Sequence, residues 1–390
     1  MRGGRVLARD AGEMRIRSEG RDECIPASGD ASVGDWVEFA GSGPPVVVHR
    51  YRGPEFPGPT SETARLSPQR MRGLAARAAI LSEIRQYFSQ EDFLEIEAPT
   101  LVPAPGLEVN IKAVPAGSGY LITSPEYSMK RLLAGGLSRI YSMPRCFRSE
   151  EEGNHHSVEF TMLEWYRAFD SLASIMRDTE TLVHRAVLRV AGCTSITVGG
   201  TLVDVAPPWT RMSIREAFAT WANIDLLGDE SAVNLAKKAE DAGIAIGSAV
   251  EWDDIFYIIF LERIQPALES LGKAIMLTDW PAPLAALART KPGAPQWALR
   301  FEAYVGGVEL ANAFDELTDA QEQRNRFEQE QRERQRRGLD VYPIDEKFMA
   351  ALEEGLPPCA GIALGVDRLA MLAFGGESLR DVSAFVGDEL

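Results

Sequence analysis

The sequence has few of the residues that build disulfide frameworks or zinc sites. Four cysteines and four histidines occur among 390 residues, and no two cysteines form a Cys-x-x-Cys pair. This scarcity favours scattered, reduced thiols. No apolar run approaches the roughly 18–20 residues that span a bilayer, and the first residues lack the apolar stretch of a signal peptide. We therefore expect a cytoplasmic protein without a membrane segment.

Positive charge is also in short supply. Lysine and arginine number 41 against 57 acidic residues, which gives a formal net charge of −16. Broad binding to nucleic acid depends on neutralising phosphates with lysine and arginine. The charge balance therefore makes tRNA an unlikely partner. The chain is long enough for one large core and a small appendage, and its hydrophobic share of 45% is ordinary for a globular protein.

Three regions follow one another along the chain. Residues 1–52 contain short alternating apolar runs between Gly, Asp and Pro turns, which predicts a small β-barrel-like unit similar to an OB barrel. Residues 53–69 are proline-rich and predict a linker. Residues 70–390 alternate helical and strand patterns with short turns, which is typical of an α+β domain with a mainly antiparallel sheet flanked by helices.

Two helices of the large domain have clear sequence signals. A helix over 71–88 should be followed by an extended segment over 93–100, in which Pro99 halts the strand. A later helix should begin at the capping residue Asp319 and stop at Gly338. Its second half contains arginines that we expect on a solvated face, namely Arg332, Arg334, Arg336 and Arg337. The apolar face of the first helix contains Met71, Leu74, Ala78, Leu81, Ile84 and Phe88.

Three separated segments, 145–166, 300–316 and 361–369, combine charges that a hydrophobic core would not accommodate. Acids that alternate with apolar residues in a strand gather their carboxylates on one sheet face. Glu302 and Glu309 could present oxygens to Mg²⁺ together with nucleotide phosphates. Arg148 and Arg368 could brace a polyphosphate.

In this order the segments resemble motifs 2 and 3 of class II aminoacyl-tRNA synthetases, and the 93–100 strand resembles motif 1. The resemblance is strongest to the elongation factor P–lysine ligase family. These paralogues of lysyl-tRNA synthetase attach lysine, preferably (R)-β-lysine, to a lysine side chain of elongation factor P. The resemblance covers about residues 70–390. The motifs that carry it are Thr123-Ser124-Pro125-Glu126-Tyr127, Met162-Leu163-Glu164-Trp165-Tyr166-Arg167, Glu309-Leu310-Ala311-Asn312 and Gly361-Ile362-Ala363-Leu364-Gly365-Val366-Asp367-Arg368.

The resemblance implies an ATP site that works with Mg²⁺. Arg148 and Arg368 would be catalytic, with Arg148 on the α-phosphate and Arg368 against the adenine ring. Glu302 and Glu309 would hold Mg²⁺. The implied nucleotide contacts are Arg148, Glu150 at the adenine amine, His156 near the triphosphate, Phe160 on the adenine ring, Glu302, Glu309, Gly365 and Arg368.

It also implies a pocket for lysine or (R)-β-lysine. Glu126 and Asn312 would orient the amino and carboxylate end. The terminal ammonium would be enclosed by Glu164, Tyr166 and Glu316. Ala363 stands where lysyl-tRNA synthetases usually have glycine, and its methyl group would reshape the pocket in a way that suits a shifted amino group.

Two other functions stay open on this reasoning. A minimal lysyl-tRNA synthetase would charge tRNA, but the first 52 residues are short and not basic for an anticodon-binding domain. A non-catalytic regulatory paralogue would have no need of so many costly charges. The resemblance further implies a closed two-fold homodimer formed through the 71–88 helix and the Pro99 strand.

Overall fold

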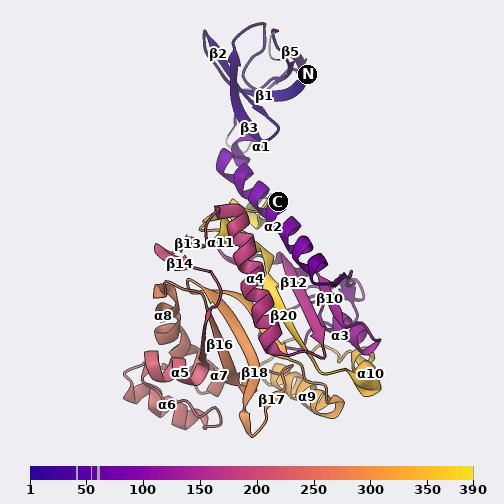
Figure 1. The fold of residues 1–390 in the computed structure, drawn as a ribbon, viewed down its shortest axis with the longest axis vertical. Helices are drawn as coiled ribbons and strands as arrows, with labels where there is room; N and C mark the ends of the chain where they lie inside the picture. Colours follow the sequence, from indigo (N-terminus) through magenta and orange to yellow (C-terminus); the bar gives the residue numbers. More distant parts are fainter. Residues whose placement is uncertain (41–42, 54, 59–61, 390) are drawn as a thin grey trace. The chain divides into compact units, whose positions relative to one another are not determined.

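The computed structural model describes residues 1–40, 43–53, 55–58 and 62–389 (Figure 1). They form two compact units, Met1–Ala75 and Ala76–Leu390. Within the predicted proline-rich linker, positions 54 and 59–61 lie outside the described residues. The boundaries after residues 52 and 69 stay predictions. In the part of the chain that is described, no helix has the length and apolar character needed to cross a bilayer.

The N-terminal unit is built around one antiparallel sheet with the order β3-β2-β1-β4-β5. Alternation along the strands places Val6, Met14, Ile16, Val37 and Phe39 in a small core. This confirms the small all-β unit that the sequence predicts. The bounds are β1 Arg2–Arg9, β2 Glu13–Ser18, β3 Arg21–Pro26, β4 Trp36–Phe39 and β5 Val46–His49, with a short helix α1 Glu62–Arg65.

A large sheet organises the second unit, with the strand order β15-β16-β18-β19-β20-β12-β10-β6. The inner pairs are antiparallel, and only the edge pairs β15–β16 and β6–β10 are parallel. The mainly antiparallel α+β prediction is confirmed. The bounds are β15 Thr210–Ser213, β16 Ile275–Pro281, β18 Ala294–Val305, β19 Val308–Asp315, β20 Cys359–Gly365, β12 Glu159–Ala168, β10 Arg139–Ser142 and β6 Leu94–Glu95, with β11 Arg145–Phe147 on β12 and β17 Thr290–Lys291 on β18.

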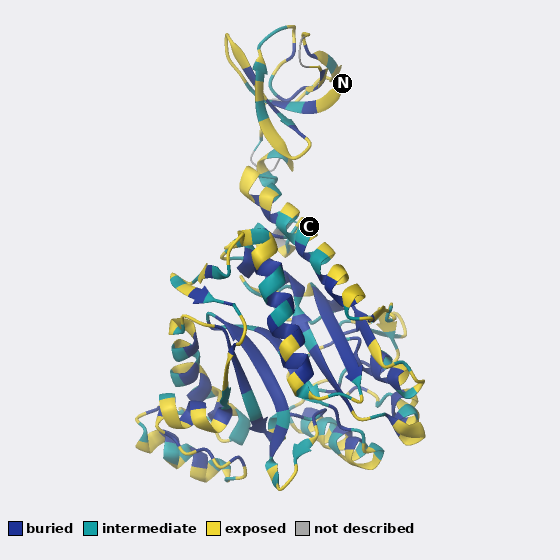
Figure 2. Cartoon of the chain, in the orientation of Figure 1, coloured by how far each residue is buried: buried dark blue, intermediate teal, exposed yellow. Residues whose placement is uncertain are grey.

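Helices cover one face of this sheet and bury its apolar side chains (Figure 2). They are α4 (Leu172–Ala191), α11 (Val366–Phe374) and the part of α2 (Pro68–Gln90) from Ala76 onward. The α2 helix confirms the prediction over 71–88, although Ala78, expected on the apolar face, is exposed. The predicted strand over 93–100 is only two residues long, Leu94–Glu95. Core residues on this face include Phe88, Leu163, Trp165, Val183, Phe301, Ile362, Leu364 and Leu369.

Two further cores flank the sheet. One joins the helices between β15 and β16 around Phe218, Phe256 and Trp280. The other joins α3, α9 and α10 around Tyr127 and Phe327. The helices are α3 Glu126–Ala134, α5 Ile214–Ala217, α6 Ala232–Asp241, α7 Trp252–Ile259, α8 Gln265–Ser270, α9 Ala320–Arg336 and α10 Glu346–Gly355. The remaining strands are β7 Leu101–Val102, β8 Pro115–Ala116, β9 Gly119–Leu121, β13 Ser195–Val198 and β14 Thr201–Asp204.

The ends of α9 follow the predicted signals. Asp319 is the N-cap, and its Oδ1 accepts a hydrogen bond from the backbone N–H of Glu322 at 2.9 Å. The helix ends at Arg336, and Gly338 just beyond it has φ +70°, a left-handed conformation that glycine adopts without strain.

Candidate active site

Four neighbouring strands place the predicted residues in one row across the sheet. Glu302 on β18 pairs with Asn312 on β19, Asn312 with Ala363 on β20, and Ala363 with Glu164 on β12. Directly paired residues point to the same face of a sheet. Tyr166 stands two residues farther along β12, so its side chain lies on this face as well. Alternation has gathered the carboxylates on one face, opposite the helices, as the sequence predicts.

This face forms the floor of a pocket of about 250 Å³, which we call the acidic pocket. All six residues predicted to bind the amino acid line it, namely Glu126, Glu164, Tyr166, Asn312, Glu316 and Ala363. Close packing at its floor requires Gly361, since a Cβ there would lie 2.2 Å from Tyr166 Cε1 and 2.7 Å from Glu316 Oε1.

Glu164 is held in place by two hydroxyl groups. Ser124 Oγ donates a hydrogen bond to Oε1 at 2.5 Å, and Tyr166 Oη donates to Oε2 at 3.1 Å. Burial and the charge of Glu126 raise the pKa of Glu164 to about 8. A nearby cation lowers such a raised pKa and favours the ionised carboxylate. The pocket therefore suits an ammonium group.

A buried lysine, Lys130, lies between two of the predicted carboxylates. Its Nζ donates to Glu126 Oε1 and lies 2.6 Å from Glu316 Oε2. Burial alone would lower the pKa of Lys130, but the two carboxylates more than offset this and raise it, so the lysine stays charged. The sequence patterns assigned no role to Lys130. Its spacing of four residues from Glu126 on α3 was the available signal.

A second pocket of about 190 Å³, which we call the arginine pocket, adjoins the first. The two pockets share five lining residues, namely Ile111, Arg148, Met162, Asn312 and Ala363. Six of the predicted nucleotide contacts line the arginine pocket, namely Arg148, His156, Phe160, Glu309, Gly365 and Arg368. Glu150 and Glu302 are not among its lining residues. Glu150 is exposed and paired with Lys112, while its neighbour Glu151 lines the pocket.

Arg148 stands where the two pockets meet. Its guanidinium carbon lies 5.2 Å from the centroid of the Phe160 ring, and its nearest acidic partner is Glu151 at 3.7 Å. The Nε atom of Arg148 is buried and has no hydrogen-bond partner among the described residues. The guanidinium therefore has donor capacity for an anion that enters either pocket.

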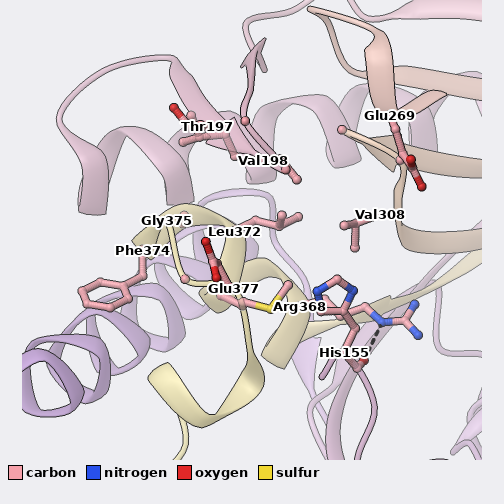
Figure 3. Close-up of a pocket in the computed structure, with 18 of the residues that line it drawn as sticks. His155, Thr197, Val198, Glu269, Val308, Arg368, Leu372, Phe374, Gly375 and Glu377 are labelled. Atoms are coloured by element: carbon pink, nitrogen blue, oxygen red, sulfur yellow. Dashed lines mark hydrogen bonds between the residues drawn. The ribbon is translucent and has the colours of Figure 1, made fainter. Parts of the chain in front are cut away.

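Arg368, at the start of α11, is anchored by three contacts. It donates from Nη1 to the Glu309 carbonyl at 2.7 Å and from Nε to the His155 carbonyl at 3.3 Å (Figure 3), and its Nη2 lies 2.6 Å from His156 Nε2. Burial, and then the charge of Arg368, lower the pKa of His156, so its neutral ring can accept this hydrogen bond. The three contacts hold the guanidinium in place.

The residues around Arg368 also border a larger cavity of about 1090 Å³. Figure 3 shows His155, Arg368 and Val308 facing this cavity, together with Thr197 and Val198 of β13. The cavity and the arginine pocket share His155, His156, Glu309 and Arg368. The arginine pocket therefore adjoins a space that could admit a bulkier group.

Glu302 and Glu309 lie on neighbouring strands, as a shared cation site would require. Glu302 is buried, its oxygens accept hydrogen bonds from Arg300 and Tyr304, and burial raises its pKa despite the attraction of Arg300. Glu309 is more open, at 44% side-chain exposure. No group of three or more acidic, cysteine or histidine residues suited to a metal occurs among the described residues. Both oxygens of Glu302 are engaged, so Glu309 is the freer of the two ligands for a Mg²⁺ ion completed by phosphate oxygens and water.

Arg300 orients Asn312. Its Nε donates to Asn312 Oδ1 at 3.0 Å, and its guanidinium carbon lies 4.4 Å from the Trp280 ring. Because the amide oxygen of Asn312 is engaged, its NH₂ group is the one left for a ligand, which suits a carboxylate. Arg300 lies in one of the charged segments of the sequence, but its role depends on a contact across strands that the sequence does not reveal.

The prediction of a solvated arginine face on α9 is wrong for Arg334. This residue is 1% exposed, its guanidinium carbon lies 4.1 Å from the Tyr342 ring, and its Nη1 donates to the Glu108 carbonyl at 2.7 Å. Its side chain turns toward the 108–111 segment, while Arg336 and Arg337 pair with acids. The chain segment that Arg334 binds is far away in sequence and gave no local signal.

Comparisons with known proteins agree with this geometry. Residues 63–389 match the family model of the class II tRNA synthetases (D, K and N). The chain is 39% identical over 337 residues to an elongation factor P–(R)-β-lysine ligase of Yersinia enterocolitica, covering 83% of this chain and 98% of that protein. It is 38% identical over 340 residues to the enzyme of the same name from Salmonella paratyphi B, covering 84% and 99%. The chain therefore belongs to the elongation factor P–(R)-β-lysine ligase family of class II tRNA synthetases.

Proposed function

We propose that this protein activates lysine or (R)-β-lysine with ATP and transfers the aminoacyl group to a lysine side chain of elongation factor P. The observation that carries the proposal is the junction of the two pockets at Arg148. One pocket has carboxylates for ammonium groups, and the other has arginines for phosphates. The names of the relatives support the same substrates and acceptor.

In the first step a carboxylate oxygen of the amino acid attacks the α-phosphorus of ATP. A carboxyl–phosphate bond forms, the bond to the leaving pyrophosphate breaks, and an acyl-adenylate results. Arg148 and Arg368 neutralise charge on the phosphates, and Asn312 positions the attacking carboxylate, so most of the acceleration comes from positioning and electrostatics. Mg²⁺, held by Glu309 and Glu302, would neutralise further phosphate charge.

In the second step the neutral amine of the acceptor lysine attacks the acyl carbon. An amide bond forms and AMP leaves. The acceptor ammonium must first give up a proton to a base. Throughout both steps the distal ammonium of the substrate stays against Glu164 and Tyr166, where a buried carboxylate compensates its charge.

The proposal is tested by incubating the protein with ATP, elongation factor P and tRNA, and with either lysine or (R)-β-lysine, and then measuring intact masses. We expect elongation factor P to gain one lysyl residue and tRNA to stay unmodified. Acylated tRNA with unmodified elongation factor P would favour the minimal lysyl-tRNA synthetase. No AMP formation with either amino acid would favour the non-catalytic paralogue.

We also propose a two-fold homodimer. The strand β6 is an edge of the large sheet, and Leu94 on it is 53% exposed, with Leu101 close by in sequence at 55%. Exposed apolar groups on an edge strand suit a self-complementary contact. Sedimentation at micromolar concentration should show a dimer, and Leu94→Lys with Leu101→Lys should convert it to a monomer. A monomeric wild-type protein contradicts the proposal.

A further inference from the structure

One carboxylate of the acidic pocket has no role in the scheme above. Glu108 lies between β7 and β8 and lines the pocket together with Ser124, Glu126 and Arg148. Its Oε2 atom is buried and has no hydrogen-bond partner among the described residues. An unpartnered buried carboxylate oxygen is costly, so it suggests a ligand.

The structure around Glu108 makes room for this carboxylate. A Cβ on Gly106 would lie 2.4 Å from Glu108 Oε2 and 3.0 Å from Thr123 Oγ1. A side chain at position 106 would therefore displace the carboxylate. Glycine at this position is needed for close approach rather than for an unusual backbone conformation.

The backbone at Glu108 is held by α9. Arg334 donates to the Glu108 carbonyl at 2.7 Å, and Glu330 Oε2 accepts a hydrogen bond from the Val109 N–H at 3.0 Å. The Ile111 N–H also donates to the Glu108 carbonyl, at 3.1 Å. Although it lies outside regular structure, Glu108 is thus fixed by a buried arginine on a rigid helix, as a binding residue should be.

The charges of the acidic pocket leave two carboxylates without a cation. Lys130 contacts both Glu126 and Glu316. Glu164 contacts only hydroxyl groups, and Glu108 forms no ion pair within 4.0 Å among the described residues. Lysine and β-lysine each contribute two ammonium groups, so the number of free carboxylates equals the number of cations that the substrate brings.

The position of each carboxylate indicates which ammonium it faces. Burial and Glu126 raise the pKa of Glu108, while the charge of Arg148 acts to lower it. The chain that follows Glu108 runs beside Arg148, since the Ser149 N–H donates a hydrogen bond to the Lys112 carbonyl at 2.8 Å and Ile111 lines both pockets. Glu108 therefore lies at the Arg148 end of the pocket, where the substrate carboxylate must meet the α-phosphate. The amino group closest to that carboxylate is the one within reach of Glu108.

We propose that Glu108 binds the amino group nearest the substrate's carboxylate. This inference rests on the proposed function, because it assigns a residue to the amino-acid substrate of that same reaction. Glu108 would give the amino end of the substrate a carboxylate of its own. Glu126, the other carboxylate predicted there, already pairs with Lys130.

The test uses Glu108→Gln, which keeps the shape of the side chain and removes its charge. Calorimetry would measure binding of lysine, (R)-β-lysine, norleucine and ε-aminocaproate. Norleucine lacks the distal amine, and ε-aminocaproate lacks the amine near the carboxylate. We expect Glu108→Gln to weaken binding of the two diamino acids and of norleucine about 10- to 100-fold, as for a lost charged hydrogen bond. Binding of ε-aminocaproate should not change.

The unchanged affinity for ε-aminocaproate also shows that the variant is folded. Glu328→Gln, at an exposed position of α9, is the matched control and should bind every ligand normally. An equal loss for all ligands, or a loss confined to ε-aminocaproate, would overturn the inference. So would normal binding with slower transfer to elongation factor P, which would make Glu108 a base. If the wild-type protein binds no diamino acid, the proposed function fails as well.

Discussion

The two pockets of the active site differ in how deeply their charged side chains are buried. In the arginine pocket, the side chains of Arg148 and Arg368 remain 24% and 22% exposed. In the acidic pocket, Lys130, Glu164 and Glu316 are no more than 1% exposed. Phosphates can be held by cations that stay near water, whereas a buried carboxylate is costly until a cation arrives. The contrast indicates that the amino acid, rather than the nucleotide, is selected by desolvated charge.

The pKa shifts follow the same division. Burial raises the pKa values of Glu108, Glu164 and Glu316 in the acidic pocket. In the arginine pocket, burial and Arg368 lower the pKa of His156, which leaves a neutral ring beside the arginine. Ionising the carboxyl groups of the acidic pocket is therefore costly without a cation, and Lys130 supplies one for Glu126 and Glu316. Four predictions test this difference.

The largest expected effect comes from removing the buried cation. Lys130→Met leaves Glu126 and Glu316 without a positive partner, so we expect the free energy of unfolding to fall by about 3–5 kcal/mol. Denaturant titration measures it. Arg148→Ala should unfold close to the wild-type midpoint, since its neighbour Glu151 is partly exposed. If the two variants lose equal stability, the contrast between the pockets is wrong.

Replacing Arg148 should cost little stability, but we expect it to cost much of the catalytic activity. Arg148→Ala should reduce lysine-dependent ATP–pyrophosphate exchange by about two orders of magnitude or more, because it removes a preorganised charge at the α-phosphate. Arg332→Ala, exposed on α9, is the control and should exchange normally. Near-normal exchange in Arg148→Ala would refute its assignment.

Glu316→Gln tests whether the acidic pocket binds the amino acid and not ATP. This residue lines the pocket and pairs with Lys130, so we expect KM for lysine to rise about 10-fold or more and KM for ATP to stay near its wild-type value. Steady-state exchange at varied lysine and ATP gives both constants. An equal rise in the two would mean that Glu316 supports the fold and not the amino acid.

The smallest expected effect is on how the thermal stability of the ligand-free protein depends on pH. The pKa of Glu164 is raised to about 8 from 4.5. A raised pKa in the folded state contributes stability at low pH that is lost as pH rises through the folded value. Glu164→Gln removes this loss, so its Tm relative to wild type should increase by a few degrees between about pH 6 and about pH 8.5. Scanning calorimetry without ligand measures it, and a constant difference in Tm contradicts the assignment.

The sequence alone determined the α+β class, the all-β start of the chain and the capped helix at Asp319. It also predicted residues that the fold brings together. The residues predicted for the amino acid all line the acidic pocket, and all but two of those predicted for the nucleotide line the arginine pocket. These residues lie in motifs whose order resembles one family, and strand alternation alone brings their side chains to one face.

Only the tertiary structure decided how the charges pair. Lys130 meets Glu316, and Arg334 meets the Glu108 carbonyl, although each pair is far apart in sequence. Glu150 has the motif's residue type but turns to Lys112 at the surface, while Glu151 lines the pocket. Sequence patterns report the face of an element on which a side chain lies. Whether a buried charge finds its partner inside the protein or is left for a ligand depends on which distant segments the fold brings within hydrogen-bonding distance.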